Sequence, residues 1–190
     1  MKTINTYSFE ELSEESKKVV IEKYKENIDI FMEFFEENCE EQINEAGFKG
    51  KVSLQYSLSH SQGDGLSFSS DYYDKLNELF VDILGSGKQK TIDLIINNCS
   101  FKLKGNKGWY CYCSSNDIIF EFDDYRGTNY LIHHLVSKVE TELQRIYVNL
   151  CAKLENEGYN EIDYQYSEEY ITENIISNDY YYTINGKMIC

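Results

Sequence analysis

Apolar residues at helical spacing mark the first part of the chain. On a helical wheel of about 100° per residue, Ile21, Tyr24, Phe31, Phe35 and Cys39 fall close to Ile28. These positions predict the buried face of an amphipathic helical region. Asn27 is a candidate position for a break between two helices. The opposite face carries carboxylates three or four residues apart, formed by Glu22, Glu26, Asp29, Glu33, Glu36, Glu37, Glu40 and Glu41. We call this set the acidic stripe.

After Gly47 the spacing of apolar residues changes from the helical period to a period of two residues. Apolar and polar residues alternate over 52–58, and Leu66 and Phe68 continue the alternation, which predicts a β-hairpin. Three further strands are expected over 100–104, 109–113 and 118–122, joined as a meander by turn-forming segments. The hairpin loop holds His60, Gln62, Gly63, Asp64 and Gly65.

The remaining segments have helical spacing. The pattern predicts short helices over 72–84, 91–97 and 167–177, a long helix over 131–154 with Gly158 just past its end, and a last strand over 180–184. Together these elements indicate an α+β fold, in which one antiparallel sheet of about five to six strands is covered by two long helices. We expect a single domain over 1–190, with an acidic helical region (1–48), a mainly β region (50–123) and a helical region with a final strand (128–190).

Charge narrows the choice of partners. The chain has 33 acidic and 18 basic residues, a net charge of −15, so direct binding to nucleic acid is disfavoured. Segments 10–45 and 155–179 hold most of the excess, and no Lys or Arg lies between Glu26 and Glu45. Neighbouring like charges on a helix cost about 0.2–0.5 kcal/mol per pair. A solvated helix face is the simpler interpretation, but a partner rich in Lys and Arg would offset this cost.

Candidate sites for chemistry have simpler structural interpretations. Cys111 and Cys113 on one strand face, with His133 and His134, resemble a zinc set, but only one weak ligand pair is present, and the two cysteines are expected to be core residues. The carboxylates of Asp64, Asp123 and Asp124 can bind Mg²⁺, although turn chemistry also explains them. The loop from His60 to Gly65 can present backbone amides to a ligand or satisfy its own polar groups. We therefore expect no cofactor, metal or catalytic residue.

Three segments resemble a known protein family. They are the start Tyr7–Lys17, the hairpin Ser61–Phe68 and the end Asn178–Gly186, which look like a widespread family of small phage and prophage proteins without an assigned activity. The hairpin carries the distinctive Ser-Gln-Gly-Asp-Gly-x-Ser-Phe motif, and the start carries Phe-x-x-Leu-Ser-x-Glu. Family members are sometimes labelled antitoxin-like. This resemblance implies a mobile-element origin.

Resemblance and charge together favour an acidic, non-enzymatic inhibitor of a host defence system. In this hypothesis the acidic stripe acts as a DNA mimic of anti-CRISPR or antirestriction type and binds a basic groove of a CRISPR effector or restriction enzyme in the host cytoplasm. It predicts no contact with nucleic acid or membrane. Two alternatives stay open: an antitoxin or phage regulatory binding protein, and a metal-dependent nucleic-acid or nucleotide enzyme using the Asp64 loop.

Overall fold

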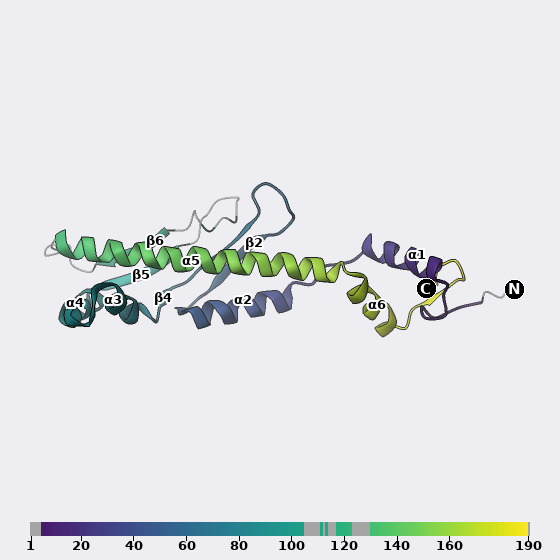
Figure 1. Ribbon diagram of the computed structural model, residues 1–190, viewed down its shortest axis with the longest axis horizontal. Coiled ribbons are helices and arrows are strands. Elements are labelled where there is room, and N and C mark those ends of the chain that lie inside the picture. Colours follow the sequence, from purple (N-terminus) through teal and green to yellow (C-terminus); the bar gives the residue numbers. More distant parts are fainter. Residues whose placement is uncertain (1–4, 105–110, 112, 114–116, 123–129, 190) are drawn as a thin grey trace. The chain divides into compact units, whose positions relative to one another are not determined.

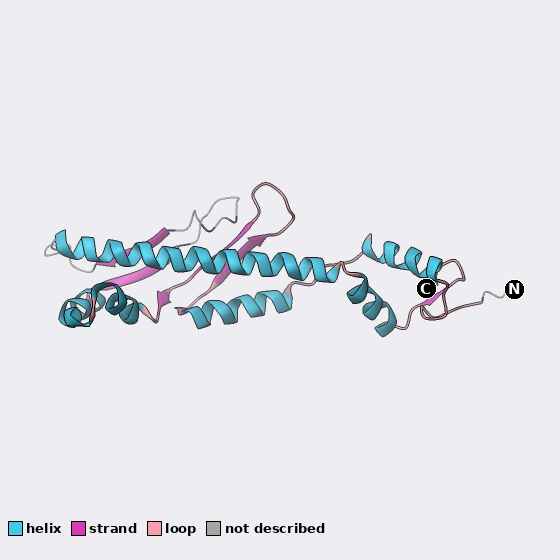
Figure 2. Cartoon of the chain, in the orientation of Figure 1, coloured by secondary structure: helices cyan, strands magenta, loops and turns pink. Residues whose placement is uncertain are grey.

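The computed structural model describes residues 5–104, 111, 113, 117–122 and 130–189, and it confirms the α+β class. The described part contains six α-helices and four pairs of short antiparallel strands (Figures 1 and 2). Contacts divide the chain into two compact units, the smaller formed by Met1–Met32 with Tyr159–Cys190 and the larger by Glu33–Gly158. Cooperative folding as one domain stays a prediction.

The smaller unit is built from two helices and a C-terminal hairpin. Helix α1 (Glu14–Lys25) begins at Ser13, whose side chain accepts a hydrogen bond from the Ser16 amide, and α6 (Glu168–Ser177) begins in the same way at Ser167. Strands β7 (Tyr181–Tyr182) and β8 (Met188–Ile189) pair antiparallel. The core between these elements consists of Phe9, Leu12, Val20, Ile21, Ile171, Ile175 and Tyr182.

The expected buried seam does not run along one helix. Helix α1 ends at Lys25 and α2 (Glu33–Ala46) starts eight residues later, which confirms a break near Asn27. The side chain of Gln165, which is only 2% exposed, forms the backbone hydrogen bonds that a helix would otherwise provide at Phe31. Its oxygen accepts from the Phe31 amide at 2.9 Å, and its nitrogen donates to the Phe31 carbonyl at 2.7 Å. The Phe31 backbone is thereby satisfied outside a helix. Its ring is 67% exposed, so the expectation that Phe31 belongs to the core is wrong.

The larger unit holds the predicted hairpin. Strands β2 (Ser53–Ser57) and β3 (Gly65–Ser69) pair antiparallel with Tyr56 opposite Leu66 and Leu54 opposite Phe68. Strand β3 is buried on both faces. Phe68 packs against Phe48 and Tyr147, with ring centroids 5.1 and 4.8 Å away, and these three buried rings form the centre of the core.

The expected sheet of five to six strands is wrong for the described residues. Besides the hairpin, β1 (Phe48–Lys49) pairs with β4 (Tyr72–Tyr73), and β5 (Cys99–Lys104) pairs directly with β6 (Asp117–Phe122). The direct β5–β6 pairing leaves no place between them for a middle strand of a meander, and most of the strand expected over 109–113 lies outside the described residues. An isolated bridge between Ser70 and Leu103 is the contact that links these short pairs.

Three shorter helices complete the larger unit. Helix α3 (Leu76–Leu84) buries Leu79 and Phe80, and α4 (Gln89–Asn97) buries Ile92 and Ile95, as the pattern predicts. The first residues of the helix expected over 72–84 instead form β4. The single turn η1 (Ser86–Lys88) joins α3 to α4.

Helix α5 (Tyr130–Gln165) continues beyond the end predicted at Leu154. Gly158 is buried inside it, where a Cβ atom would lie 2.5 Å from Leu58 Cδ1 and 2.8 Å from Phe35 Cζ. The glycine therefore permits close packing of α5 against α2 and the end of β2. Sequence reasoning took it as a helix terminator because glycine usually stands there.

Candidate protein-binding surface

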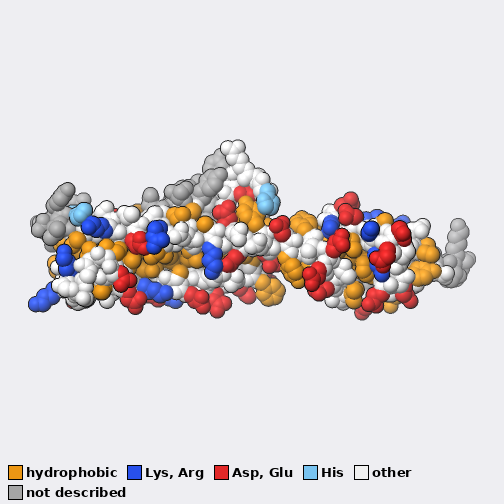
Figure 3. Space-filling model, viewed as in Figure 1, with side chains coloured by type: hydrophobic (Ala, Val, Ile, Leu, Met, Phe, Trp, Pro, Cys, Tyr) orange, Lys and Arg blue, Asp and Glu red, His pale blue; other side chains and the backbone are white. Residues whose placement is uncertain are grey.

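Helix α2 buries three residues on one face and exposes its carboxylates on the rest of its surface. Phe35, Cys39 and Ile43 are buried, with Phe35 5% and the other two 0% exposed. Five carboxylates of the acidic stripe are exposed on the rest of the helix, namely Glu33, Glu36, Glu37, Glu40 and Glu41. Figure 3 shows Asp and Glu side chains gathered along the edge that α2 forms. We call this set the α2 acidic face.

Most of the α2 acidic face is not neutralised by the chain's own cations. Among the described residues, no Lys, Arg or His forms an ion pair with any of its five carboxylates. The two lysines that approach α2 contact other groups: Lys153 contacts Gln42 Oε1 at 2.7 Å and Glu157, and Lys75 donates to the Glu45 carbonyl. The negative charge of this face is therefore directed to solvent.

Glu36 is the exception because it has a partner within the fold. The Tyr56 hydroxyl donates to Glu36 Oε1 at 2.6 Å, which fastens α2 to β2. Burial and this hydrogen bond to an anion raise the pKa of Tyr56, so the phenol stays protonated and continues to donate. Glu36 thus orients the helix as well as adding charge.

The structure does not bring the whole acidic stripe together. Glu22, Glu26 and Asp29 belong to the smaller unit, where they are exposed, and Glu22 lies 3.9 Å from Lys25. Glu168 and Glu169 on α6 are exposed in the same unit. The α2 acidic face is the part of the stripe that shares one helix.

An exposed aromatic ring on α2 was missed by sequence reasoning. Phe34 is 82% exposed, the highest value among the large hydrophobic side chains of the described residues. It precedes the buried Phe35, and adjacent helical residues point about 100° apart, so Phe34 lies away from the direction in which Phe35 enters the core. That spacing was the signal that could have identified Phe34 as an exposed ring next to Glu33 and Glu37.

The loop of the β2–β3 hairpin is organised around Asp64. Its carboxylate accepts hydrogen bonds from the backbone amides of Ser59 at 2.6 Å and Ser61 at 2.9 Å, and from the hydroxyls of Ser57, Ser59 and Ser61 at 2.8, 3.1 and 3.0 Å. Burial alone would raise the pKa of Asp64, but the hydrogen bonds from Ser61, Ser57 and Ser59 outweigh burial and hold the pKa well below its ordinary range. These contacts favour the structural interpretation of Asp64 over a metal ligand or catalytic group.

The other loop residues surround this carboxylate. His60 adopts a positive φ of 56° and Gly63 one of 108°, which turns the chain around Asp64. His60 and Gln62 are exposed, whereas Asp64 and Gly65 are buried. A ligand role for the loop stays a prediction. Asp123 and Asp124, the other carboxylates considered for Mg²⁺, lie outside the described residues.

We expect Asp64→Asn to loosen the hairpin loop, because the amide replaces an acceptor oxygen with an NH₂ group that faces serine donors. Amide hydrogen exchange should show lower protection at Ser59 and Ser61, while Gln62→Ala, an exposed control in the same loop, should leave both unchanged.

The wild-type loop should also respond to acid with a defined sign. Because the folded-state pKa of Asp64 is depressed, its contribution is complete above the ordinary aspartate pKa of about 4 and is lost only as pH falls below that value toward the folded pKa. Protection at Ser61 that is lost well above about pH 4 would contradict this assignment.

The buried thiols are poor nucleophiles. Burial raises the pKa of Cys39 to about 12, with the nearby Glu157 and Glu36 adding to the shift, and burial with a hydrogen bond to Cys113 raises that of Cys151. Both are therefore protonated at neutral pH. His133 and His134 are exposed on α5, and among the described residues no three His, Cys, Asp or Glu side chains gather as a metal site.

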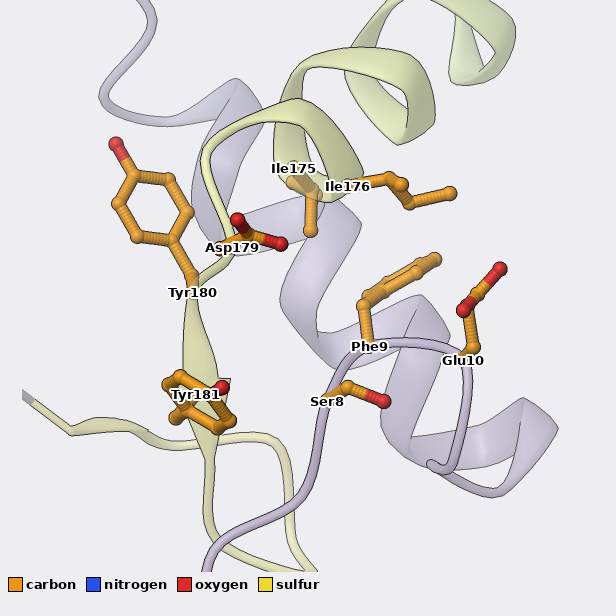
Figure 4. Close-up of a pocket in the computed structure, with 8 residues that line it drawn as sticks. All are labelled: Ser8, Phe9, Glu10, Ile175, Ile176, Asp179, Tyr180 and Tyr181. Atoms are coloured by element: carbon orange, nitrogen blue, oxygen red, sulfur yellow. The ribbon is translucent and has the colours of Figure 1, made fainter.

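A shallow depression opens on the smaller unit (Figure 4). Its lining residues are Ser8, Phe9, Glu10, Ile175, Ile176, Asp179, Tyr180 and Tyr181. The volume of about 60 Å³ is room for about two waters. It is too small to hold a side chain, and we assign it no ligand.

Comparisons with known proteins do not assign the chain to a family. No family model, no curated protein and no solved structure matches the chain. The resemblance to small phage and prophage proteins therefore stays a prediction.

None of the helices in the described part of the chain is both long enough and apolar enough to span a membrane.

Proposed function

We propose that this chain is an acidic protein inhibitor encoded by a phage or prophage, which binds the basic groove of a host nucleic-acid-handling defence protein in the host cytoplasm. The target is of the CRISPR effector or restriction enzyme type. The α2 acidic face enters the groove in place of the nucleic acid, and the inhibitor performs no chemistry of its own.

The observation that carries this proposal is the unpaired charge of α2. The chain has 18 basic residues, yet no ion pair from the described residues reaches the α2 acidic face. Carboxylates three or four residues apart on a helix lie about 5 to 6 Å from one another. Such a row presents negative charge at a regular interval, as a nucleic-acid strand does.

Surface charge of this kind acts mainly on the rate of association. Complementary potentials steer the partners together and raise association rates by about 10- to 1,000-fold at low salt. Residence on the target then requires contacts that exclude water, and exposed aromatic residues are the usual ones. Phe34 supplies such a ring next to the carboxylates.

A competition experiment tests the proposal. The tagged chain is used to capture proteins from a bacterial lysate at low and at high salt, and each captured protein is then mixed with its own DNA or RNA. We expect a nucleic-acid-handling protein that is released by salt and that cannot hold nucleic acid and this chain together. A captured partner that keeps its nucleic acid would contradict the proposal, and capture of a small toxin would support the antitoxin alternative instead.

Activity in cells provides the second arm. Strains that each carry one defined CRISPR or restriction system are challenged with a phage that the system blocks, with and without expression of this chain. Plaque formation should return to the level of the strain without that system wherever the target is present.

A further inference from the structure

A cavity of about 350 Å³ opens in the smaller unit, between the C-terminal half of α1 and the β7–β8 hairpin. Its walls include Tyr24, Tyr180, Tyr182 and Met188, and Lys23 and Asn27 add the polar groups. Small-molecule pockets start at about 300 Å³ and combine apolar walls with a few polar groups. The cavity therefore has the size and composition of a site for one large side chain.

The cavity is preformed because the hairpin is fixed to the rest of the unit. The Ser16 hydroxyl donates to the Ile184 carbonyl at 2.7 Å, and Tyr7 and Tyr182 exchange two backbone hydrogen bonds of 2.9 Å. Gly186 has a φ of 72° and approaches α1 so closely that a Cβ atom would lie 2.8 Å from the Ser16 carbonyl oxygen. Binding to a preformed site costs little free energy for ordering the side chains of its walls.

The three tyrosines give the cavity its chemistry. Tyr182 is 2% exposed and forms part of the core beneath, whereas Tyr24 and Tyr180 are half-buried. Burial raises the pKa of Tyr24, and it raises that of Tyr182 to about 12, with the neighbouring phenols adding to both shifts. The phenols of Tyr24 and Tyr182 are therefore neutral at physiological pH. The electron-rich rings of the three tyrosines attract cations.

The surroundings of the cavity also favour a cation. The smaller unit contains 13 acidic and 6 basic residues, and the C-terminal end of α1, which carries partial negative charge, borders the opening. The Asn27 side-chain nitrogen donates to the Lys23 carbonyl at 2.8 Å. No donor in the described part of the chain reaches its side-chain oxygen, so that oxygen can accept from a ligand.

We propose that this cavity binds the guanidinium group of an arginine on the surface of the basic target, an inference that rests on the proposed function. A guanidinium is planar, stacks on aromatic rings and is more weakly hydrated than an ammonium, so it enters an aromatic cavity more readily than lysine does. Lys23, which is exposed at the rim, opposes a cation, and Lys25 adds a second positive charge in the same last turn of α1.

Titration of the purified chain with N-acetylarginine amide tests this assignment without any partner. Tyrosine ring signals are followed by nuclear magnetic resonance, and N-acetylcitrulline amide serves as the neutral probe of nearly the same shape. We expect saturable shifts at Tyr24 and Tyr180 with the arginine probe, and about tenfold weaker binding of citrulline, because the cation–π attraction is absent. Equal binding of both probes overturns the proposal.

Three variants locate the site and fix the sign of its charge. Tyr180→Leu should abolish the shifts. Tyr181→Leu, which changes the 55% exposed ring of the next residue along the chain, should leave them intact because Tyr181 does not line the cavity. Lys23→Gln should tighten arginine binding a few-fold by removing a like charge. Weaker binding in Lys23→Gln would show an anionic occupant and refute the proposal. Because these readouts need no target, their failure leaves the α2 proposal standing.

Discussion

The variant carrying Glu33→Lys, Glu37→Lys and Glu40→Lys is expected to lose inhibition while keeping its fold. All three side chains are exposed and form no ion pair with the described residues, so each reversal should change the free energy of unfolding by less than about 0.5 kcal/mol. Each replacement exchanges a negative for a positive charge, and α2 would then repel a basic groove. Plaque assays should return to the level without inhibitor. Glu36 stays unchanged because Tyr56 depends on it.

A matched control variant distinguishes the effect of charge on α2 from the effect of the net charge of the whole chain. Glu78→Lys, Asp82→Lys and Asp93→Lys change the net charge by the same amount on exposed positions of α3 and α4 in the same unit. This variant should still inhibit, with slower association at low salt because long-range steering weakens. Circular dichroism establishes that both variants are folded. Retained inhibition by the α2 variant, or equal loss in both, would place the contact surface elsewhere.

The sequence identified the residues of the acidic stripe, but it did not show that they are divided between the two compact units. Helical spacing identified Ile21, Phe35 and Cys39 correctly as buried, whereas Tyr24 and Ile28 are half-buried and Phe31 is exposed. The break between the helices depends on Gln165, which is more than 130 positions away in the chain and satisfies the Phe31 backbone. Spacing within 20 residues carries no information about such a distant donor.

Strand pairing shows the same limit. The hairpin β2–β3 was predictable because its partners are close in the chain and its loop has turn residues. The direct pairing of β5 with β6 was not, because alternation indicates which residues face inward but not which strand lies alongside. The tyrosine-lined cavity escaped detection for a related reason, since Tyr24 meets Tyr180 and Tyr182 only when both ends of the chain are brought into one unit.

Gly158→Val is expected to cause the largest loss of stability among the variants discussed. A Cβ atom at this position would already lie 2.5 Å from Leu58 Cδ1 and 2.8 Å from Phe35 Cζ, and the two methyl groups of valine extend further. Overpacking of this kind costs about 1–3 kcal/mol. The higher helix propensity of valine returns only a few tenths of a kcal/mol. Thermal and urea unfolding should both show the loss.

Asn156→Val provides the control, because Asn156 is exposed on the same helix two residues earlier. It introduces the same side chain without a packing conflict and should change the free energy of unfolding by less than about 0.5 kcal/mol. Phe35 connects this test to function, since its displacement shifts the helix that carries the α2 acidic face. We therefore expect Gly158→Val to weaken inhibition below its unfolding temperature as well. A Gly158→Val protein as stable as the wild type would show that α5 and α2 do not pack closely at this point.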